Sequence, residues 1–190
     1  NVNDPDNKSK SPLHYKKMGR ILAGETVKVL TNTSCESNLS VCCKKETLSI
    51  PLRKLKEEDL IKAQIEVNAN DISEIDKVFA NEILEFSKNR TDSADVEVQV
   101  IKIGNTTITG FPGDVFVEYG LQIKKGSPFE YNLLSSHTNG RNGYIPTKEA
   151  FAQGGYEIRT TRSNKLAHNA GEIITKCVLS IMNEIKTYNM

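Results

Sequence analysis

The hydrophobic positions of the chain repeat with a helical period in some stretches and alternate in others. Residues 12–30 and the two parts of residues 57–89 place apolar side chains at helical spacing, and polar residues 68–71 separate those two parts. Residues 165–188 form a last amphipathic pattern of the same kind. Apolar positions three and four residues apart lie on one face of a helix, so we expect helices over these ranges.

Strand-like patterns fill three other ranges. Residues 35–52 are rich in β-forming residues and predict either a hairpin or one long bent strand. Residues 95–111 alternate clearly around a turn at Gly104-Asn105, and residues 127–135 form a third run. Together with the helices, these strands favour an α/β fold of the mixed α+β kind, in which helices pack on a layered sheet.

The unusual residues of the chain gather between Phe111 and Tyr156. An apolar run ends in Pro112-Gly113, and Asp114 follows as the expected first residue of a helix that stops at Gly126. A further strand then leads into residues 137–144, which are too rich in Gly and Asn for regular structure. The order of strand, turn, helix and strand predicts a βαβ-like unit.

This unit would bring two polar side chains together. If its two strands are parallel neighbours, the loops after them open on the same edge of the sheet, where ligands bind in such folds. Asp114 and Tyr144, which are thirty positions apart, would then converge. From the pattern alone, the simpler interpretation is that Asp114 is only a helix N-cap and Tyr144 only a half-buried aromatic residue.

The same stretch resembles the second half of the catalytic domain of the neutral/alkaline, non-lysosomal ceramidases. In that family a strand ends in Pro-Gly-Glu, and Pro112-Gly113-Asp114 stands at this place. The family then has an Asn, a Tyr after four intervening residues, and Ile/Val-x-Thr, which Asn139 and residues 144–147 fit. Its following Gln-x-Tyr-Glu is similar to residues 153–157.

The resemblance implies a zinc-dependent amide hydrolase of ceramide-like lipids. It implies that Asp114 and Tyr144 are zinc ligands and that Tyr156 lines the active site as a catalytic residue. Asn139 and Arg141 would shape the loop or contact the substrate. Two departures bear on this: Asp114 is one methylene shorter than the family's Glu, and Arg141 stands where better-known members have a Tyr.

The ligand set in this chain is incomplete by the family's standard. A hydrolytic zinc needs about three protein ligands and a water, and the family takes its His ligands from the first half of the domain. Nothing here is similar to that half, and His137 alone lies near the motif, where it reads as a loop or supporting residue. We therefore expect residues 1–190 to be the C-terminal half of a larger catalytic domain, with residues 1–12 as a linker-like start and the upstream half as a partner.

Composition narrows the classes of function. The net charge is +1 and basic residues are scattered among acids, which argues against electrostatically driven binding of nucleic acid. No apolar run is long enough for a transmembrane helix. The resemblance implies a secreted or periplasmic protein.

Cys35, Cys42, Cys43 and Cys177 are expected to be buried free thiols, with a Cys35–Cys42 disulfide as the alternative.

Three functional hypotheses follow. The first is a ceramidase-like zinc amidohydrolase that cleaves the N-acyl bond of a lipid amide. The second is a hydrolase of another substrate on the same scaffold, for which Arg141 favours an anionic compound. The third is a non-catalytic relative whose metal site has decayed. The charged face of residues 57–89 is expected to be solvated only.

Overall fold

The computed structural model describes residues 13–89 and 91–187. The chain forms two compact units, residues 1–39 and residues 40–190, which are described separately. The first unit contains helix α1, His14–Thr31, as the apolar spacing predicted. The expected linker-like start at residues 1–12 lies outside the described residues.

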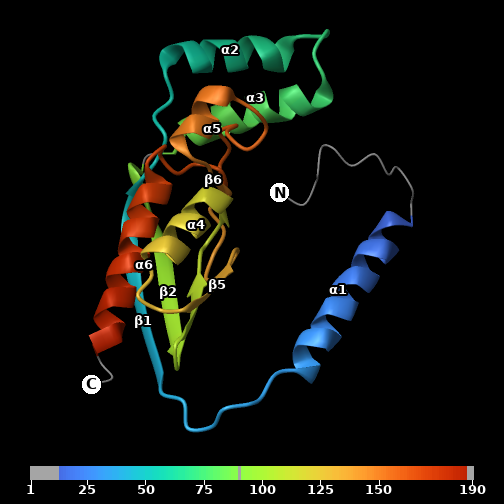
Figure 1. The fold of residues 1–190 in the computed structure, drawn as a ribbon. Coiled ribbons are helices and arrows are strands. Elements are labelled where there is room, and N and C mark those ends of the chain that lie inside the picture. The colour runs from blue at the N-terminus through green and yellow to red at the C-terminus, as the bar shows by residue number, and fades with distance from the viewer. Residues whose placement is uncertain (1–12, 90, 188–190) are drawn as a thin grey trace. The chain divides into compact units, whose positions relative to one another are not determined.

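The second unit is built on a four-stranded sheet (Figure 1). Its order is β1-β2-β3-β5, with β1 at Val41–Pro51, β2 at Ser93–Ile103, β3 at Thr106–Gly110 and β5 at Tyr131–Ser135. The first two pairs are antiparallel, whereas β3 and β5 are parallel. The three strand ranges and the β2–β3 hairpin are confirmed, and the first range forms one long strand rather than a hairpin.

One face of the sheet is covered by α6, Ala170–Thr187, and α4, Val117–Gly126 (Figure 1). Alternate residues of β2 enter the core on this side, and α6 contributes its apolar face to the same cluster. The two helices pack closely, since a Cβ on Gly171 would lie 2.1 Å from the buried Tyr119 ring. The expected α/β layer architecture is confirmed.

The other face of the sheet carries two rows of mainly apolar side chains that run across all four strands. The register places them as Val41, Ile103, Thr106 and Tyr131 in one row, and Cys43, Ile101, Ile108 and Leu133 in the next. Within this unit Val41 is 68% exposed and Leu133 is 57% exposed. This face therefore resembles one side of a layered core rather than an ordinary polar surface.

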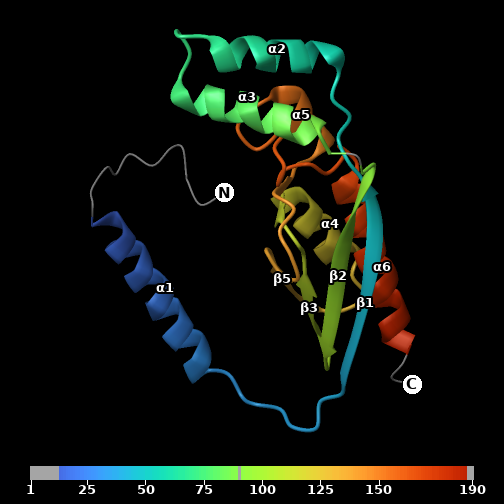
Figure 2. The same ribbon diagram turned by 180° about the vertical axis from the view of Figure 1, so that it is seen from behind.

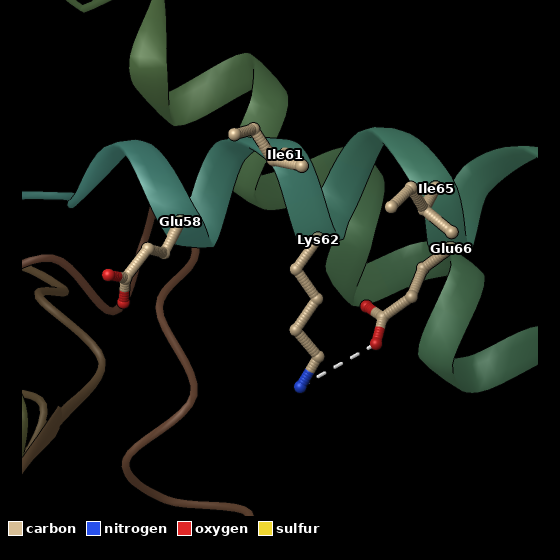
Figure 3. Close-up of a pocket in the computed structure, with 5 residues that line it drawn as sticks. All are labelled: Glu58, Ile61, Lys62, Ile65 and Glu66. Carbon is tan, nitrogen blue, oxygen red and sulfur yellow. Dashed lines mark ion pairs between the residues drawn. The ribbon is translucent and has the colours of Figure 1, made fainter.

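Two helices, α2 at Glu57–Asn68 and α3 at Glu74–Ser87, form an antiparallel pair beyond the end of the sheet (Figure 2). The break between them was predicted, but the cap of α3 is Ser73, whose hydroxyl accepts a hydrogen bond from the Asp76 N–H, and not Asn70 or Asp71. A shallow hollow on α2 is drawn in Figure 3, where Lys62 pairs with Glu66 beside Ile61 and Ile65. It contains none of the residues of the ceramidase-like motif.

The predicted βαβ unit is confirmed, with one correction. Asp114 does not begin α4, because Asp114 and Val115 form the short strand β4 and the helix starts at Val117 after Phe116. β4 pairs in parallel with β6, Tyr144–Ile145, which leads through the Thr147 cap into α5, Lys148–Gln153. The interpretation of Asp114 as a helix N-cap is therefore wrong.

The C-terminal part differs from expectation at its start. The last helix begins at Ala170 rather than Lys165, because Leu166 bridges to Leu52 at the end of β1. All four cysteines are free, as expected, but Cys35 and Cys43 are exposed and the other two are only partly buried. Among the described residues, no helix combines the length and apolar content needed to cross a bilayer.

Candidate metal and substrate site

The turn that follows β3 is held by the loop of residues 137–143. The Thr138 N–H donates to the Phe111 carbonyl at 2.7 Å, and the Asn142 N–H donates to the Pro112 carbonyl at 2.7 Å. The buried Asn142 amide adds a second hydrogen bond to the same Pro112 oxygen at 3.2 Å. The loop is irregular, as predicted, but it is tied down by backbone hydrogen bonds.

Gly113 is required where the two segments meet. A Cβ at this position would lie 2.6 Å from the Gly143 carbonyl oxygen and 3.2 Å from an Ile145 side-chain carbon. This close approach lets the Asp114 N–H donate to the Gly143 carbonyl at 2.8 Å, which starts the β4–β6 pair.

Asp114 and Tyr144 are directly paired across β4 and β6. Neighbouring strands lie about 4.8 Å apart, and paired residues present their side chains on the same side. The two residues that the sequence singled out therefore come together, through the parallel arrangement that the βαβ pattern predicted. Both are partly buried at the carboxyl edge of the sheet.

Tyr156 belongs to the same cluster. Its ring meets the Tyr144 ring edge to face, with centroids 6.0 Å apart, and meets the Phe79 ring of α3 in the same manner at 5.7 Å. Tyr156 is 56% exposed, so these ring contacts leave much of the residue accessible. The structure thus places Tyr156 against Tyr144, and its catalytic role stays a prediction.

The phenol of Tyr144 lies in an acidic environment. Burial, together with the nearby Asp114, Tyr156 and Glu157, raises its pKa above the ordinary value. The phenol is therefore neutral near neutral pH in the protein alone, and a bound cation would be needed to favour the phenolate.

Arg53 and Asn164 hold the loop that carries Tyr156. The buried Arg53 guanidinium donates to the Leu166 carbonyl at 2.9 Å, to the Ile158 carbonyl at 2.7 Å, and to the Asn164 amide oxygen at 3.3 Å. Burial lowers the pKa of Arg53 to about 10, which leaves it charged near neutral pH. The Asn164 amide in turn donates to two carbonyls of the same loop, at Glu157 and Arg159.

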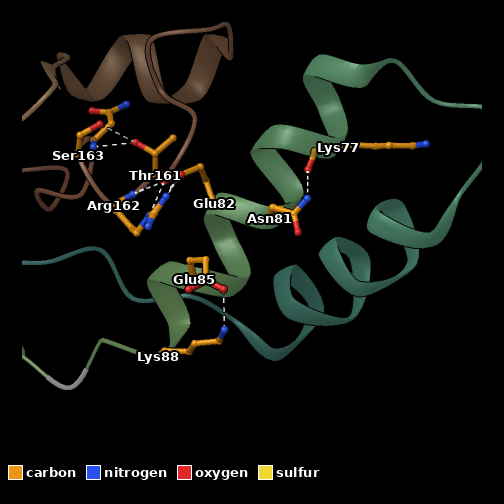
Figure 4. A network of polar contacts seen from close by, with 9 residues as sticks. Lys77, Asn81, Glu82, Glu85, Lys88, Thr161, Arg162 and Ser163 are labelled. Atoms are coloured by element: carbon orange, nitrogen blue, oxygen red, sulfur yellow. Dashed lines mark hydrogen bonds and ion pairs between the residues drawn. The ribbon is translucent and has the colours of Figure 1, made fainter.

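Charges on α3 fasten this loop from the other side. Arg162 binds Glu82 through its guanidinium and through its backbone N–H, and Figure 4 shows the pair between the loop and α3. Arg159 pairs with Asp76 at 2.8 Å and stacks over the Phe79 ring. The expectation of a merely solvated charged face is thus wrong for Asp76 and Glu82, because residues far away in the sequence pair with them.

The two predicted substrate-contact residues are both exposed but differ in their contacts. Asn139 is exposed, has a left-handed backbone with φ of 63°, and donates to the Gln99 side chain of β2 at 3.2 Å. Arg141 is exposed and forms no hydrogen bond or ion pair with a described residue. The structure thus gives Asn139 a role in fixing the loop and leaves the Arg141 guanidinium open.

His137 is the residue that sequence reasoning undervalued. Its Nε2 atom lies 2.7 Å from Asp114 Oδ1, although the side chains are 23 positions apart. Only the position of His137 in the same Gly- and Asn-rich loop pointed to it in the sequence.

The donors present fit a metal ion in part. A carboxylate, a phenol and an imidazole gather at Asp114, Tyr144 and His137, and zinc accepts oxygen and nitrogen ligands. Within the described residues, no group of three His, Cys, Asp or Glu side chains is placed to hold a metal. Asp114 and Tyr144 therefore suit two places of a ligand set that other residues would complete.

Comparison with known proteins gives a likeness of fold. Neutral ceramidase from Pseudomonas aeruginosa aligns with 98% of this chain and 35% of its own, at 12% sequence identity and a TM-score of 0.56. A structure described as a ceramidase complexed with C2 aligns with 50% of this chain and 15% of its own, at 16% identity and a TM-score of 0.45. No model of a protein family matches the sequence, and the comparison with curated proteins also gives no match.

The fold is thus similar to that of neutral ceramidase at the level of structure. The chain spans about a third of the length of that enzyme, and nearly the whole chain takes part in the alignment.

Proposed function

We propose that this chain is part of a zinc-dependent amide hydrolase resembling neutral ceramidase, which cleaves the N-acyl bond of a ceramide-like lipid amide. The observation that carries the proposal is the pairing of Asp114 with Tyr144 on adjacent parallel strands, with the Tyr156 ring beside them. The similarity of fold to a neutral ceramidase supports it independently of any one residue. As in that class of secreted or periplasmic enzymes, we expect a role in sphingolipid metabolism outside the cytoplasm.

Each residue of the cluster has a part in the proposed reaction. Asp114 and Tyr144 would hold zinc, which when bound polarises a carbonyl and lowers the pKa of a bound water to about 7. The Tyr156 hydroxyl would donate a hydrogen bond to the carbonyl oxygen of the scissile amide as negative charge develops there. The contacts of the Tyr156 ring with the Tyr144 and Phe79 rings restrict its orientation.

The remaining ligands would come from an upstream half of the same catalytic domain. Two observations support this partner: the incomplete donor set at Asp114 and Tyr144, and the alignment with only 35% of the ceramidase chain. The exposed apolar rows of the sheet offer a surface for this upstream half. The rows extend along β2 toward Gln99, whose side chain accepts a hydrogen bond from Asn139 of the site loop. A polypeptide packed on these rows would lie next to the site.

An anionic substrate is the second candidate. Arg141 is exposed and has no carboxylate partner among the described residues, so its guanidinium is available for a carboxylate or phosphate group of a substrate. Arg141 belongs to the loop of residues 137–143, which is hydrogen-bonded to the turn before Asp114, so we expect such a group to lie near the scissile bond.

Substrate profiling tests the proposal and separates the two candidates. The chain joined to its upstream half would be assayed on an N-acyl sphingoid base and on a small anionic N-acyl amino acid. We expect hydrolysis of the lipid amide, and a fall of about 100-fold in kcat for Tyr156→Phe, which removes only the hydroxyl. Arg141→Gln serves as the comparison: a rise in KM confined to the anionic amide favours the second candidate.

Failure to hydrolyse either amide would refute the proposal and favour a non-catalytic relative. Unchanged kcat in Tyr156→Phe, with activity intact, would instead reject the role of Tyr156 alone.

A further inference from the structure

His137 has a strained backbone conformation, and its imidazole contacts Asp114. Its φ of 54° lies in the left-handed region, which costs a non-glycine residue free energy and persists only where the surroundings fix it. The strain is held by hydrogen bonds on both sides, since the His137 N–H donates to the Gly113 carbonyl at 3.3 Å and the Thr138 N–H donates to the Phe111 carbonyl. Such strain is common where a side chain must be aimed at a functional group.

The imidazole is aimed at one oxygen of the carboxylate. His137 Nε2 lies 2.7 Å from Asp114 Oδ1, and an ionised carboxylate can only accept, so the ring donates its Nε2–H. This is the only side-chain hydrogen bond of Asp114 to a described residue, and Oδ2 has no partner there. Both side chains stay partly exposed, at 46% for His137 and 39% for Asp114, so neither is sealed into the core.

We propose that His137 is a positioning residue, which orients Asp114 through Oδ1 and leaves Oδ2 available to the metal ion that Asp114 and Tyr144 would hold. The inference rests on the proposed function and adds to it a residue that the ceramidase-like motif does not contain. Carboxylates that bind metals are themselves held by hydrogen bonds, and loss of such a partner lowers metal affinity by about 10- to 100-fold. Asp has fewer side-chain rotamers than Glu, so fixing Oδ1 of Asp114 largely determines the direction of Oδ2.

Zinc binding to the 190-residue chain tests this role. Zinc alone would be titrated into ¹⁵N-labelled protein, and the shifts of the Asp114 and Tyr144 amides would report the affinity. The chain supplies only part of the ligand set, so we expect weak but measurable binding. His137→Gly removes the imidazole and accepts the left-handed backbone, so we expect affinity to fall by at least about tenfold while the melting temperature of the metal-free protein does not fall.

His137→Gln separates positioning from direct ligation. The Gln amide can donate a hydrogen bond to Asp114, so we expect it to recover part of the lost affinity. When zinc is added to the native protein, the ring ¹⁵N shifts of His137 should keep the pattern that they have in the metal-free protein. A shift typical of a zinc-bound ring nitrogen would overturn the inference, because His137 would then be a ligand.

Two control variants isolate the effect. His168→Ala removes an exposed imidazole that stacks on Phe151, and Asn38→Gly relieves another left-handed position with φ of 62°; neither should alter zinc affinity. Native affinity in His137→Gly would refute the positioning role and leave the metal site standing. If added zinc shifts neither the Asp114 nor the Tyr144 amide signal of the native chain, the metal site itself is refuted.

Discussion

At the scale of single residues, the site depends on a close approach of two backbones. Gly113 lies against the Gly143 carbonyl and the Ile145 side chain, so there is no space for a Cβ. The hydrogen bond from the Asp114 N–H to the Gly143 carbonyl, and with it the pairing of Asp114 and Tyr144, requires this contact. The close packing at Gly113, together with the preference of Pro-Gly for turns, therefore explains the Pro112-Gly113 pair.

We expect Gly113→Ala to destabilise the second unit by about 1–3 kcal/mol, the usual cost of forcing extra atoms into a packed place. It should also weaken zinc binding, because the clash pushes Tyr144 away from Asp114. Urea unfolding followed by circular dichroism measures the first effect. The matched control is Gly24→Ala, where nothing lies within 4 Å and the helix should gain content. A Gly113→Ala protein as stable as the native one would contradict the packing described.

The sequence predicted Asp114, Tyr144 and Tyr156 as neighbours, but it could not predict how Asp114 is used. Locally, an acid after Pro-Gly and before a helical pattern reads as a helix cap. The strand partner that makes it part of β4 arrives only at Tyr144, after a loop whose course depends on long-range hydrogen bonds. His137 was undervalued for the same reason, since its contact with Asp114 depends on a left-handed backbone that no local pattern reveals.

At the scale of elements, α3 and the loop of residues 154–165 act together. α3 supplies Phe79 for the Tyr156 ring and supplies Asp76 and Glu82 for Arg159 and Arg162. The helices and strands themselves followed from apolar periodicity, because each buries one face. The ion pairs that hold this loop could not be predicted, because a charged residue in the sequence gives no sign of whether its side chain is solvated or paired.

The Glu82–Arg162 tether should be lost in acid. The Arg162 guanidinium, followed by its backbone N–H, holds the pKa of Glu82 below the ordinary value. A lowered pKa in the folded state means that the pair stabilises above the unfolded pKa of about 4.3 and is lost as pH falls through the folded pKa. Glu82→Gln should therefore be less stable than the native protein at pH 6, and the difference should shrink below about pH 4.3.

Limited proteolysis of residues 154–165 checks where this stabilisation acts. We expect faster cleavage in Glu82→Gln at pH 6 than in Glu85→Gln, because Glu82 binds Arg162 of the loop directly whereas Glu85 forms its ion pair with Lys88 of its own helix. Equal cleavage of the two variants would show that Glu82 does not hold the loop.

At the scale of the whole molecule, the second unit has one covered face and one exposed apolar face. α6 and α4 complete a core on one side, whereas the rows through Ile101 and Ile103 stay partly exposed on the other. Alternation of apolar residues predicted strands with buried faces, but it could not show which face this chain covers by itself. The upstream half that we propose as a partner would cover the exposed apolar rows.

The most direct test of the account is the zinc content of the purified protein, measured by elemental analysis with and without the upstream half. We expect near-stoichiometric zinc when both halves are present, little in this chain alone, and loss of zinc in Asp114→Ala and in Tyr144→Phe. His168→Ala should retain it. Absence of zinc from both forms, or full zinc in Asp114→Ala and Tyr144→Phe, would contradict the account.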